Sequence, residues 1–286
     1  MKKITFHLWY NKEAKKAAEF YTSTFKDSKI KNISTIHNTP SGSVDIVTIE
    51  ILGQEFTLIS AGPLFKFNPS VSFTVNCESV EEVDSLWEKI SEKGTALMEL
   101  GEYPFSKRYG WLKDKYGVSW QLILREDKQK IIPSLLFVQE NNGKAKEAIE
   151  FYTSIFKNSR FVESAEYEEG EGSTPGHLKY ARFTLEGKDF IAMDGGLSHK
   201  FTFNEAISFI VHCSTQKEID YYWEKLSAVP ESEQCGWLKD KYGVSWQIVP
   251  TILGELMKKK PKQVTEAFLK MKKFNIAELE KAAEEE

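Results

Sequence analysis

The sequence predicts an α+β protein with two tandem halves, each built from paired β-α-β-β-β modules, and with C-terminal helices. Three observations predict this fold class. The segment at residues 110–121 recurs letter for letter at 236–247, so the chain contains an internal duplication. Each half passes twice through one strand pattern, one helical pattern and further strand patterns. After Pro250 the strand pattern ends and helical spacing takes over.

The elements of the first half follow from residue periodicity. Apolar and polar residues alternate in the predicted strands, and apolar residues recur at helical spacing in the predicted helices. The first module is predicted at residues 3–10, 13–25, 29–37, 45–52 and 55–60. The second module is predicted at residues 70–77, 80–93, 95–100, around Trp111 and at 118–124.

The second half repeats this order, which gives four predicted segments of the chain. The first domain is predicted at residues 1–125, a charged linker at 126–130, the second domain at 131–251 and a helical tail at 252–286. The tail is expected to contain a helix over 262–272 and a second helix capped by Asn275. Its basic residues are consistent either with a solvated helix face or with an acidic partner.

Composition excludes several classes of function. The chain has 286 residues and a net charge of −4, which offers no general attraction to nucleic acid or to an anionic membrane. The three cysteines form neither a disulfide framework nor a zinc pattern. No apolar run approaches the length that spans a membrane, and the N-terminus enters a strand at once. We therefore expect a cytoplasmic protein.

Several stretches resemble a known family. Phe-His-Leu-Trp-Tyr, Ala-Glu-Phe-Tyr and the repeated Gly-Trp-Leu-Lys-Asp-Lys-Tyr-Gly-Val-Ser-Trp-Gln segment are similar to the vicinal-oxygen-chelate superfamily, which includes glyoxalase, bleomycin-resistance proteins and extradiol dioxygenases. Within it they resemble the PhnB-like group, often labelled "3-demethylubiquinone-9 3-methyltransferase domain". The resemblance implies tandem glyoxalase-like domains with cupped mixed sheets. A Gly-rich turn that would hold adenosylmethionine is not found in the sequence, so the methyltransferase label is not expected to describe the activity.

The superfamily holds a divalent metal with ligands on defined strands, and the resemblance maps those positions onto this chain. They fall at His7 and Leu135, near Ser60 and Asp194, at Ser72 and Ser208, and at Gln121 and Gln247. Neutral amides and hydroxyls bind divalent transition metals weakly. We therefore expect no cofactor, and retain a divalent metal at His7 and Gln121 only as the weaker alternative.

The candidate site residues share the expected cavity face or a loop above it. His7 is the candidate catalytic residue, as a general base or a hydrogen-bond donor, and its alternative role is that of an interior histidine. Candidate substrate-binding residues are Trp9, Ser72, Tyr103, Arg108, Ser119, Gln121, Asp194, Ser208, His212 and Gln247. Tyr103 and Arg108 lie in a loop at 94–109 that is longer than its counterpart at 227–235. That difference indicates either one elaborated pocket or simple loop drift.

Three functions remain open at this point. The first is binding of a small organic molecule in a cupped sheet. The second is a metal-dependent lyase, isomerase or dioxygenase, and the third is a catalytically silent duplication that binds a partner. Because single-half relatives pair as homodimers, the doubled chain is expected to form that pairing within itself and to be a monomer or a weak homodimer.

Overall fold

The computed structural model describes residues 2–39, 41–171, 173–195 and 199–284. The first half contains β1 (Ile4–Tyr10), α1 (Ala14–Thr24), β2 (Ser28–Thr39), β3 (Gly42–Ile51), β4 (Gln54–Ser60), β5 (Val71–Cys77), α2 (Val80–Ser91), β6 (Thr95–Tyr103), β7 (Ser106–Lys113) and β8 (Ser119–Leu124). The second half contains β9 (Ile131–Phe137), α3 (Ala145–Ile155), β10 (Arg160–Glu166), β11 (Leu178–Leu185), β12 (Lys188–Asp194), β13 (Ile207–Cys213), α4 (Gln216–Leu226), β14 (Trp237–Lys239) and β15 (Ser245–Pro250). The tail contains α5 (Leu253–Lys259), α6 (Pro261–Phe268) and α7 (Ile276–Glu284).

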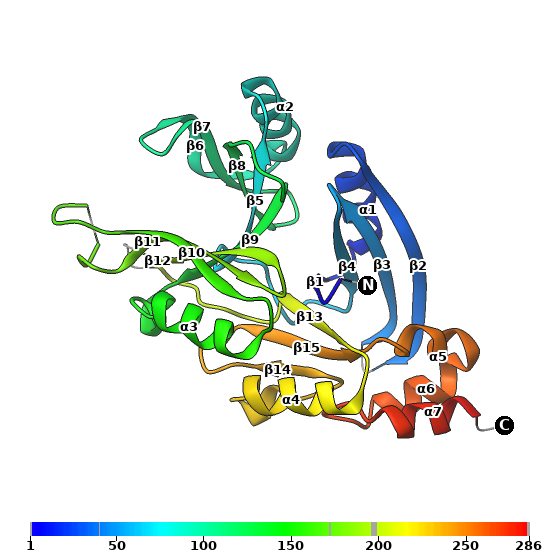
Figure 1. Ribbon diagram of the computed structural model, residues 1–286. Helices are drawn as coiled ribbons and strands as arrows, with labels where there is room; N and C mark the ends of the chain where they lie inside the picture. Colours follow the sequence, from blue (N-terminus) through cyan, green and yellow to red (C-terminus); the bar gives the residue numbers. More distant parts are fainter. Residues whose placement is uncertain (1, 40, 172, 196–198, 285–286) are drawn as a thin grey trace.

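These strands form two mixed sheets (Figure 1). Sheet I has the order β14-β15-β13-β1-β4-β3-β2, and sheet II has the order β10-β11-β12-β9-β5-β8-β7-β6. The predicted α+β class and its modules are confirmed. The sheets, however, join modules from opposite halves: β1 pairs antiparallel with β13, and β5 pairs antiparallel with β9. Each sheet therefore needs strands from both halves.

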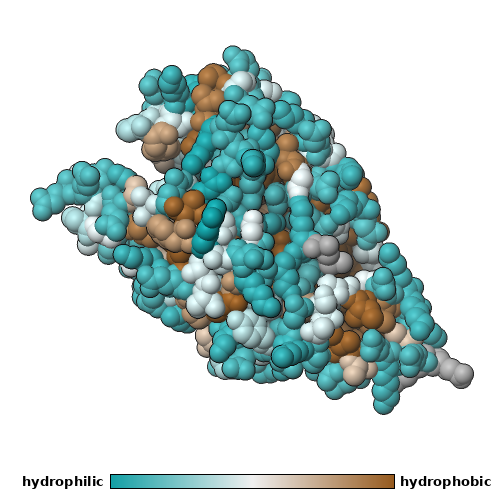
Figure 2. Space-filling view, viewed as in Figure 1, coloured by the Kyte–Doolittle hydropathy of each residue, from teal (hydrophilic) through white to brown (hydrophobic). Residues whose placement is uncertain are grey.

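Modules of the same half meet through side chains instead of backbone hydrogen bonds. Phe6 of β1 lies 5.4 Å from Phe73 of β5, ring centre to ring centre. Tyr21 and Phe25, at α1, pack on Trp120 of β8. All are buried, and burying one such aromatic side chain contributes roughly 2–3 kcal/mol. This apolar layer lies between the two sheets, and the face shown in Figure 2 is mostly hydrophilic with small apolar patches.

The repeated segment owes its identity to a buried carboxylate in each copy. Asp240 accepts hydrogen bonds from Tyr152 Oη, Trp246 Nε1 and the backbone N–H groups of Tyr242 and Val244. In the other copy, Asp114 accepts the corresponding four, from Tyr21, Trp120, Tyr116 and Val118. In each copy one acidic side chain thus fixes the turn before β8 or β15 and joins that turn to α1 or α3, respectively. This network gives a structural reason why the aspartate, the tryptophan and the turn residues are the same in both copies.

The tail covers one edge of sheet I. Backbone N–H groups of Cys235 and Gly236 donate to the carbonyls of Met271 and Lys272, at 2.8 and 2.7 Å. In sheet II, β6 pairs with β7; in sheet I, this tail segment lies at the equivalent edge, beside β14. The predicted cap is confirmed, since the Asn275 side chain accepts from Glu278 N. The predicted helix over 262–272 is too long: α6 ends at Phe268, and the chain turns before α7.

Among the helices in the described part of the chain, none is both long and apolar enough to cross a membrane.

Candidate functional site

Each sheet has one row of short polar side chains on the face away from the shared aromatic layer. In sheet I the register aligns His7 with Ser208, and Ser208 with Ser245. In sheet II it aligns Ser134 with Ser72, and Ser72 with Ser119. The counterpart of His7 is therefore Ser134. The expected counterpart, Leu135, is wrong by one residue, because the gap assumed in that comparison does not exist between β1 and β9.

The polar row of sheet II is satisfied by its own side chains. Gln121 Nε2 donates to Ser72 Oγ at 2.8 Å, and Tyr109 Oη donates to Gln121 Oε1 at 2.8 Å. Trp111 Nε1 donates to Ser119 Oγ at 2.7 Å. Ser134 shares a hydrogen bond with the hydroxyl of Thr74. Every side chain in this row has a protein partner, so a ligand would have to displace existing hydrogen bonds.

The loop predicted at 94–109 is wrong: these residues form β6 and the start of β7, a hairpin that makes one edge of sheet II. Tyr103 stacks on Phe105, and both rings pack against Tyr109. The Tyr103 hydroxyl donates to the carbonyl of Glu99. Arg108 points to the opposite side, where its Nε lies 2.6 Å from Asp84 of α2. The structure therefore does not bring Arg108 together with Ser119 and Gln121, because neighbouring residues of a strand face opposite sides.

In sheet I the corresponding serine and glutamine side chains form fewer hydrogen bonds than in sheet II. Gln247 Nε2 donates to Ser208 Oγ at 2.9 Å, as its counterpart does. Cys235, however, is the sequence counterpart of Tyr109, and none of the tyrosines in the described part of the chain donates to Gln247 Oε1. Among the described residues, neither His7 Nδ1 nor Ser245 Oγ has a hydrogen-bond partner, although both atoms are buried. An unsatisfied buried polar atom costs about 1–3 kcal/mol, so two in one row require an explanation.

Aromatic side chains cover this row. The Trp237 indole lies edge-on to the His7 ring at 5.1 Å and 6.0 Å from Trp9. Trp9 packs in turn on Phe65 and donates its Nε1 hydrogen to the carbonyl of Gly62. Burial lowers the pKa of His7 to about 3, so its imidazole is neutral near pH 7. A neutral imidazole offers one donor and one acceptor, and the tautomer decides which nitrogen plays which role.

Two further candidates lie elsewhere. His212 shares the face of Ser208, but its Nε2 is held at 2.8 Å by the Thr5 hydroxyl near the N-terminal end of β1. Asp194 lies on the helix-covered face, where its carboxylate accepts from the backbone N–H groups of Gly143, Ala145 and Leu178. Asp194 thus holds the start of α3 and is not positioned to meet a ligand beside Ser208.

The donor set does not fit a strongly bound divalent metal. The row of sheet I offers one imidazole, and the remaining oxygen and nitrogen donors are neutral side chains of serine and glutamine. Within the described ranges, no group of three or more His, Cys, Asp or Glu side chains is arranged to hold an ion. We therefore derive no chemical step through a metal.

Sequence reasoning missed Trp237, Ser245 and Cys235 as members of the site. Trp237 and Ser245 are the repeat counterparts of Trp111 and Ser119, and the repeat itself does not distinguish the two copies. A usable signal existed at the residue before each repeated segment, which is Tyr109 in one copy and Cys235 in the other. The backbone differs there as well: Tyr109 lies within β7, whereas Cys235 has a φ of +52° and precedes β14.

Comparisons with known proteins agree with this duplicated architecture. The sequence matches the family described as "3-demethylubiquinone-9 3-methyltransferase" twice, over residues 2–123 and 129–249. A solved structure described as a putative 3-demethylubiquinone-9 3-methyltransferase, PhnB protein, from Bacillus cereus is 44% identical. It covers 42% of this chain and 97% of its own, with a TM-score of 0.40. Glyoxalase I from Zea mays is 12% identical over 89% of this chain and 96% of its own, with a TM-score of 0.57, which supports the fold. Among curated proteins, none matches this sequence.

Proposed function

Because the chain belongs to the family described as 3-demethylubiquinone-9 3-methyltransferase, the PhnB-like group of the vicinal-oxygen-chelate fold, we propose that it binds a small organic molecule on the polar face of sheet I. His7, Ser208, Ser245 and Gln247 provide the polar contacts. Trp9 and Trp237 provide the apolar wall.

One observation carries this proposal: two buried polar atoms of the same row, His7 Nδ1 and Ser245 Oγ, have no partner within the described residues. The equivalent row of sheet II, built from the same repeated segment, is fully paired. A ligand with hydrogen-bonding groups would satisfy the atoms that the protein leaves unsatisfied. Sheet I is therefore the binding face, and sheet II is the closed copy.

The surroundings restrict the ligand chemistry. Indole rings favour flat, largely apolar molecules, and the neutral His7 and the amide of Gln247 favour carbonyl or hydroxyl groups over a formal charge. Compact aromatic compounds such as phenols and quinones meet both requirements. Because Trp237 lies directly on His7, entry of the ligand requires this indole to move.

The test uses a thermal-shift screen of the full chain with phenols and quinones, followed by titration of tryptophan fluorescence. Ser245→Ala should weaken binding about tenfold or more and leave stability nearly unchanged, since Ser245 Oγ has no hydrogen-bond partner among the described residues. Ser119→Ala is the matched control in sheet II. It removes the acceptor of Trp111 Nε1, so it should cost about 1 kcal/mol of stability without affecting binding.

Absence of any ligand from a broad screen, or equal effects of Ser245→Ala and Ser119→Ala, would contradict the proposal. Metal analysis of the purified protein distinguishes the metal-dependent alternative, which predicts a bound divalent ion.

A further inference from the structure

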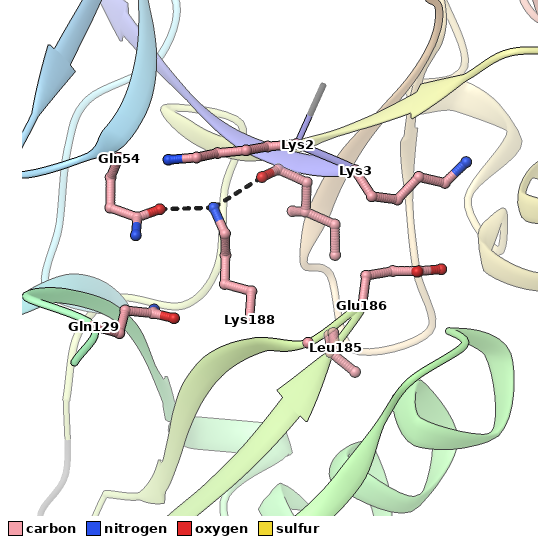
Figure 3. A pocket seen from close by; sticks show the side chains of 9 residues that line it. Lys2, Lys3, Gln54, Gln129, Leu185, Glu186 and Lys188 are labelled. Atoms are coloured by element: carbon pink, nitrogen blue, oxygen red, sulfur yellow. Dashed lines mark hydrogen bonds between the residues drawn. The ribbon is translucent and has the colours of Figure 1, made fainter. Parts of the chain in front are cut away.

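A second place in the molecule has the features of a reactive site and lies away from the polar row of sheet I. A hollow of about 190 Å³ opens where the start of β1, the start of β4 and the β11–β12 hairpin meet (Figure 3). Lys188, Gln54 and Gln129 line it, together with Lys2 and Lys3. Its volume equals that of about six water molecules at ~30 Å³ each, which suits a molecule of a few carbon atoms.

The Lys188 amino group is held in a way that favours a free amine. Its Nζ donates to the carbonyl of Ile4 at 2.9 Å and to Gln54 Oε1 at 2.8 Å, and it lies 4.5 Å from the centre of the Phe6 ring. Throughout the described ranges, no carboxylate forms an ion pair with it; Glu186, on the same hairpin, accepts instead from Tyr222 Oη. A neutral amine has two N–H groups and one lone pair. Both N–H groups have acceptors here, and the lone pair is left for a reaction partner.

The charged and titratable groups around this amine do not offset its burial. Burial, followed by repulsion from Lys2, lowers the pKa of Lys188 to about 7, and the attraction of Glu55 only partly opposes this. The remaining neighbours have partners of their own: Lys3 pairs with Glu218, Asp189 pairs with Arg182, and His212 bonds Thr5. Near neutral pH about half of the Lys188 side chains are therefore unprotonated, against roughly one in three thousand for an ordinary lysine.

We propose that Lys188 is a covalent binding site for a small carbonyl compound that carries a carboxylate, such as a short 2-oxo acid or an aldehyde acid. The lone pair of Nζ forms the N–C bond to the carbonyl carbon, and the carbonyl π pair moves to oxygen. That oxygen leaves as water with both amine hydrogens, and C=N remains. A proton taken up by the imine restores one N–H, which can return to Ile4 O or Gln54 Oε1.

The carboxylate requirement comes from the lining of the hollow. Lys2 borders it and in Figure 3 extends towards the Gln54 side, and Lys3 starts from the same strand end. The positive charge of Lys2 lowers the pKa of Lys188, and the same charge attracts an anion into the hollow. A carbonyl compound that carries a negative charge is therefore attracted by Lys2 to the place where burial keeps the amine neutral, whereas an uncharged aldehyde gains nothing from this attraction.

The test is reductive trapping on the intact full-length protein. Wild-type protein is incubated with glyoxylate and cyanoborohydride at pH 7, digested, and each lysine is scored by mass spectrometry. We expect Lys188 to be labelled more than about tenfold faster than exposed lysines such as Lys225, with a rate that rises through pH 7 instead of near pH 10. Propanal serves as the uncharged probe and should label Lys188 more slowly than glyoxylate does.

Two variants complete the design. Lys188→Arg should abolish the fast label, and Lys225→Arg should leave it unchanged. Labelling of Lys188 at the rate of exposed lysines would overturn the assignment of a reactive amine, and equal rates with glyoxylate and propanal would overturn the ligand class. The wild-type measurement does not depend on whether a variant folds.

Discussion

Replacing Lys188 by methionine should change how stability depends on pH. The pKa of Lys188 is about 7 in the folded chain and 10.5 as its ordinary value, so the folded state disfavours the proton that the unfolded chain binds. The native protein is therefore penalised as pH falls from 10.5 towards 7. Between pH 10 and pH 6 this penalty grows by about 4 kcal/mol, at about 1.4 kcal/mol for each unit of pKa difference.

Methionine carries no charge and fills a similar volume. It also loses the hydrogen bonds to Ile4 O and Gln54 Oε1, at roughly 1 kcal/mol each and independent of pH. At pH 10 the variant should therefore be about 1–2 kcal/mol less stable than the wild type, and at pH 6 it should be more stable by about 2 kcal/mol.

Urea unfolding of both proteins across this pH range measures the difference directly, because the other ionisable groups contribute equally to both. The matched control is Lys225→Met, which should leave the pH dependence unchanged. A difference between wild type and Lys188→Met that stays constant from pH 6 to pH 10 would refute the account of the buried amine.

Three further predictions concern other parts of the molecule. Burial lowers the pKa of His7 to about 3, so the free energy of unfolding should fall as pH drops below 6.5. His7→Gln should remove about 3 kcal/mol of that loss between pH 7 and pH 4.5, and urea unfolding at both pH values measures it. Asp240→Ala should cost about 4 kcal/mol because four buried donors lose their acceptor, whereas Tyr152→Phe should cost about 1 kcal/mol because one hydrogen bond is lost; thermal unfolding compares the two, and equal costs would contradict the network. Residues 1–125 expressed alone should self-associate, since each sheet needs strands of both halves, and sedimentation of a folded monomer would contradict this.

The repeated elements could be predicted from the sequence because periodicity is a local property. The alternation around His7 and the helical spacing around Tyr21 placed strand and helix within a few residues, and the duplication made every module visible twice. The pairing of β1 with β13 could not be predicted in the same way. Either choice of partner buries the same aromatic face, so the pattern of one strand does not identify its neighbour.

The sequence predicted which face of each sheet carries the polar residues, but it did not predict which of those residues have hydrogen-bond partners. Strand parity placed His7, Ser119 and Gln121 each on the polar side of a sheet, but the expected grouping of the three is wrong, because His7 lies in sheet I and the other two lie in sheet II. It could not show that Tyr109 closes one copy, because that depends on a hydroxyl reaching across to the next strand. Asp194 was misplaced for a related reason: a carboxylate at a strand end can face either a ligand or the start of a helix, and sequence alone does not distinguish them.

The exchange of strands between the halves also has an evolutionary consequence. In a symmetric pair of identical chains every substitution occurs twice, so a change that closes the polar face of one sheet also closes that of the other. Fusion of the copies into one polypeptide removes that constraint. Tyr109 could then close the polar row of sheet II while the corresponding row of sheet I kept two unpaired atoms among the described residues, and the closed copy could serve as a rigid support for the other.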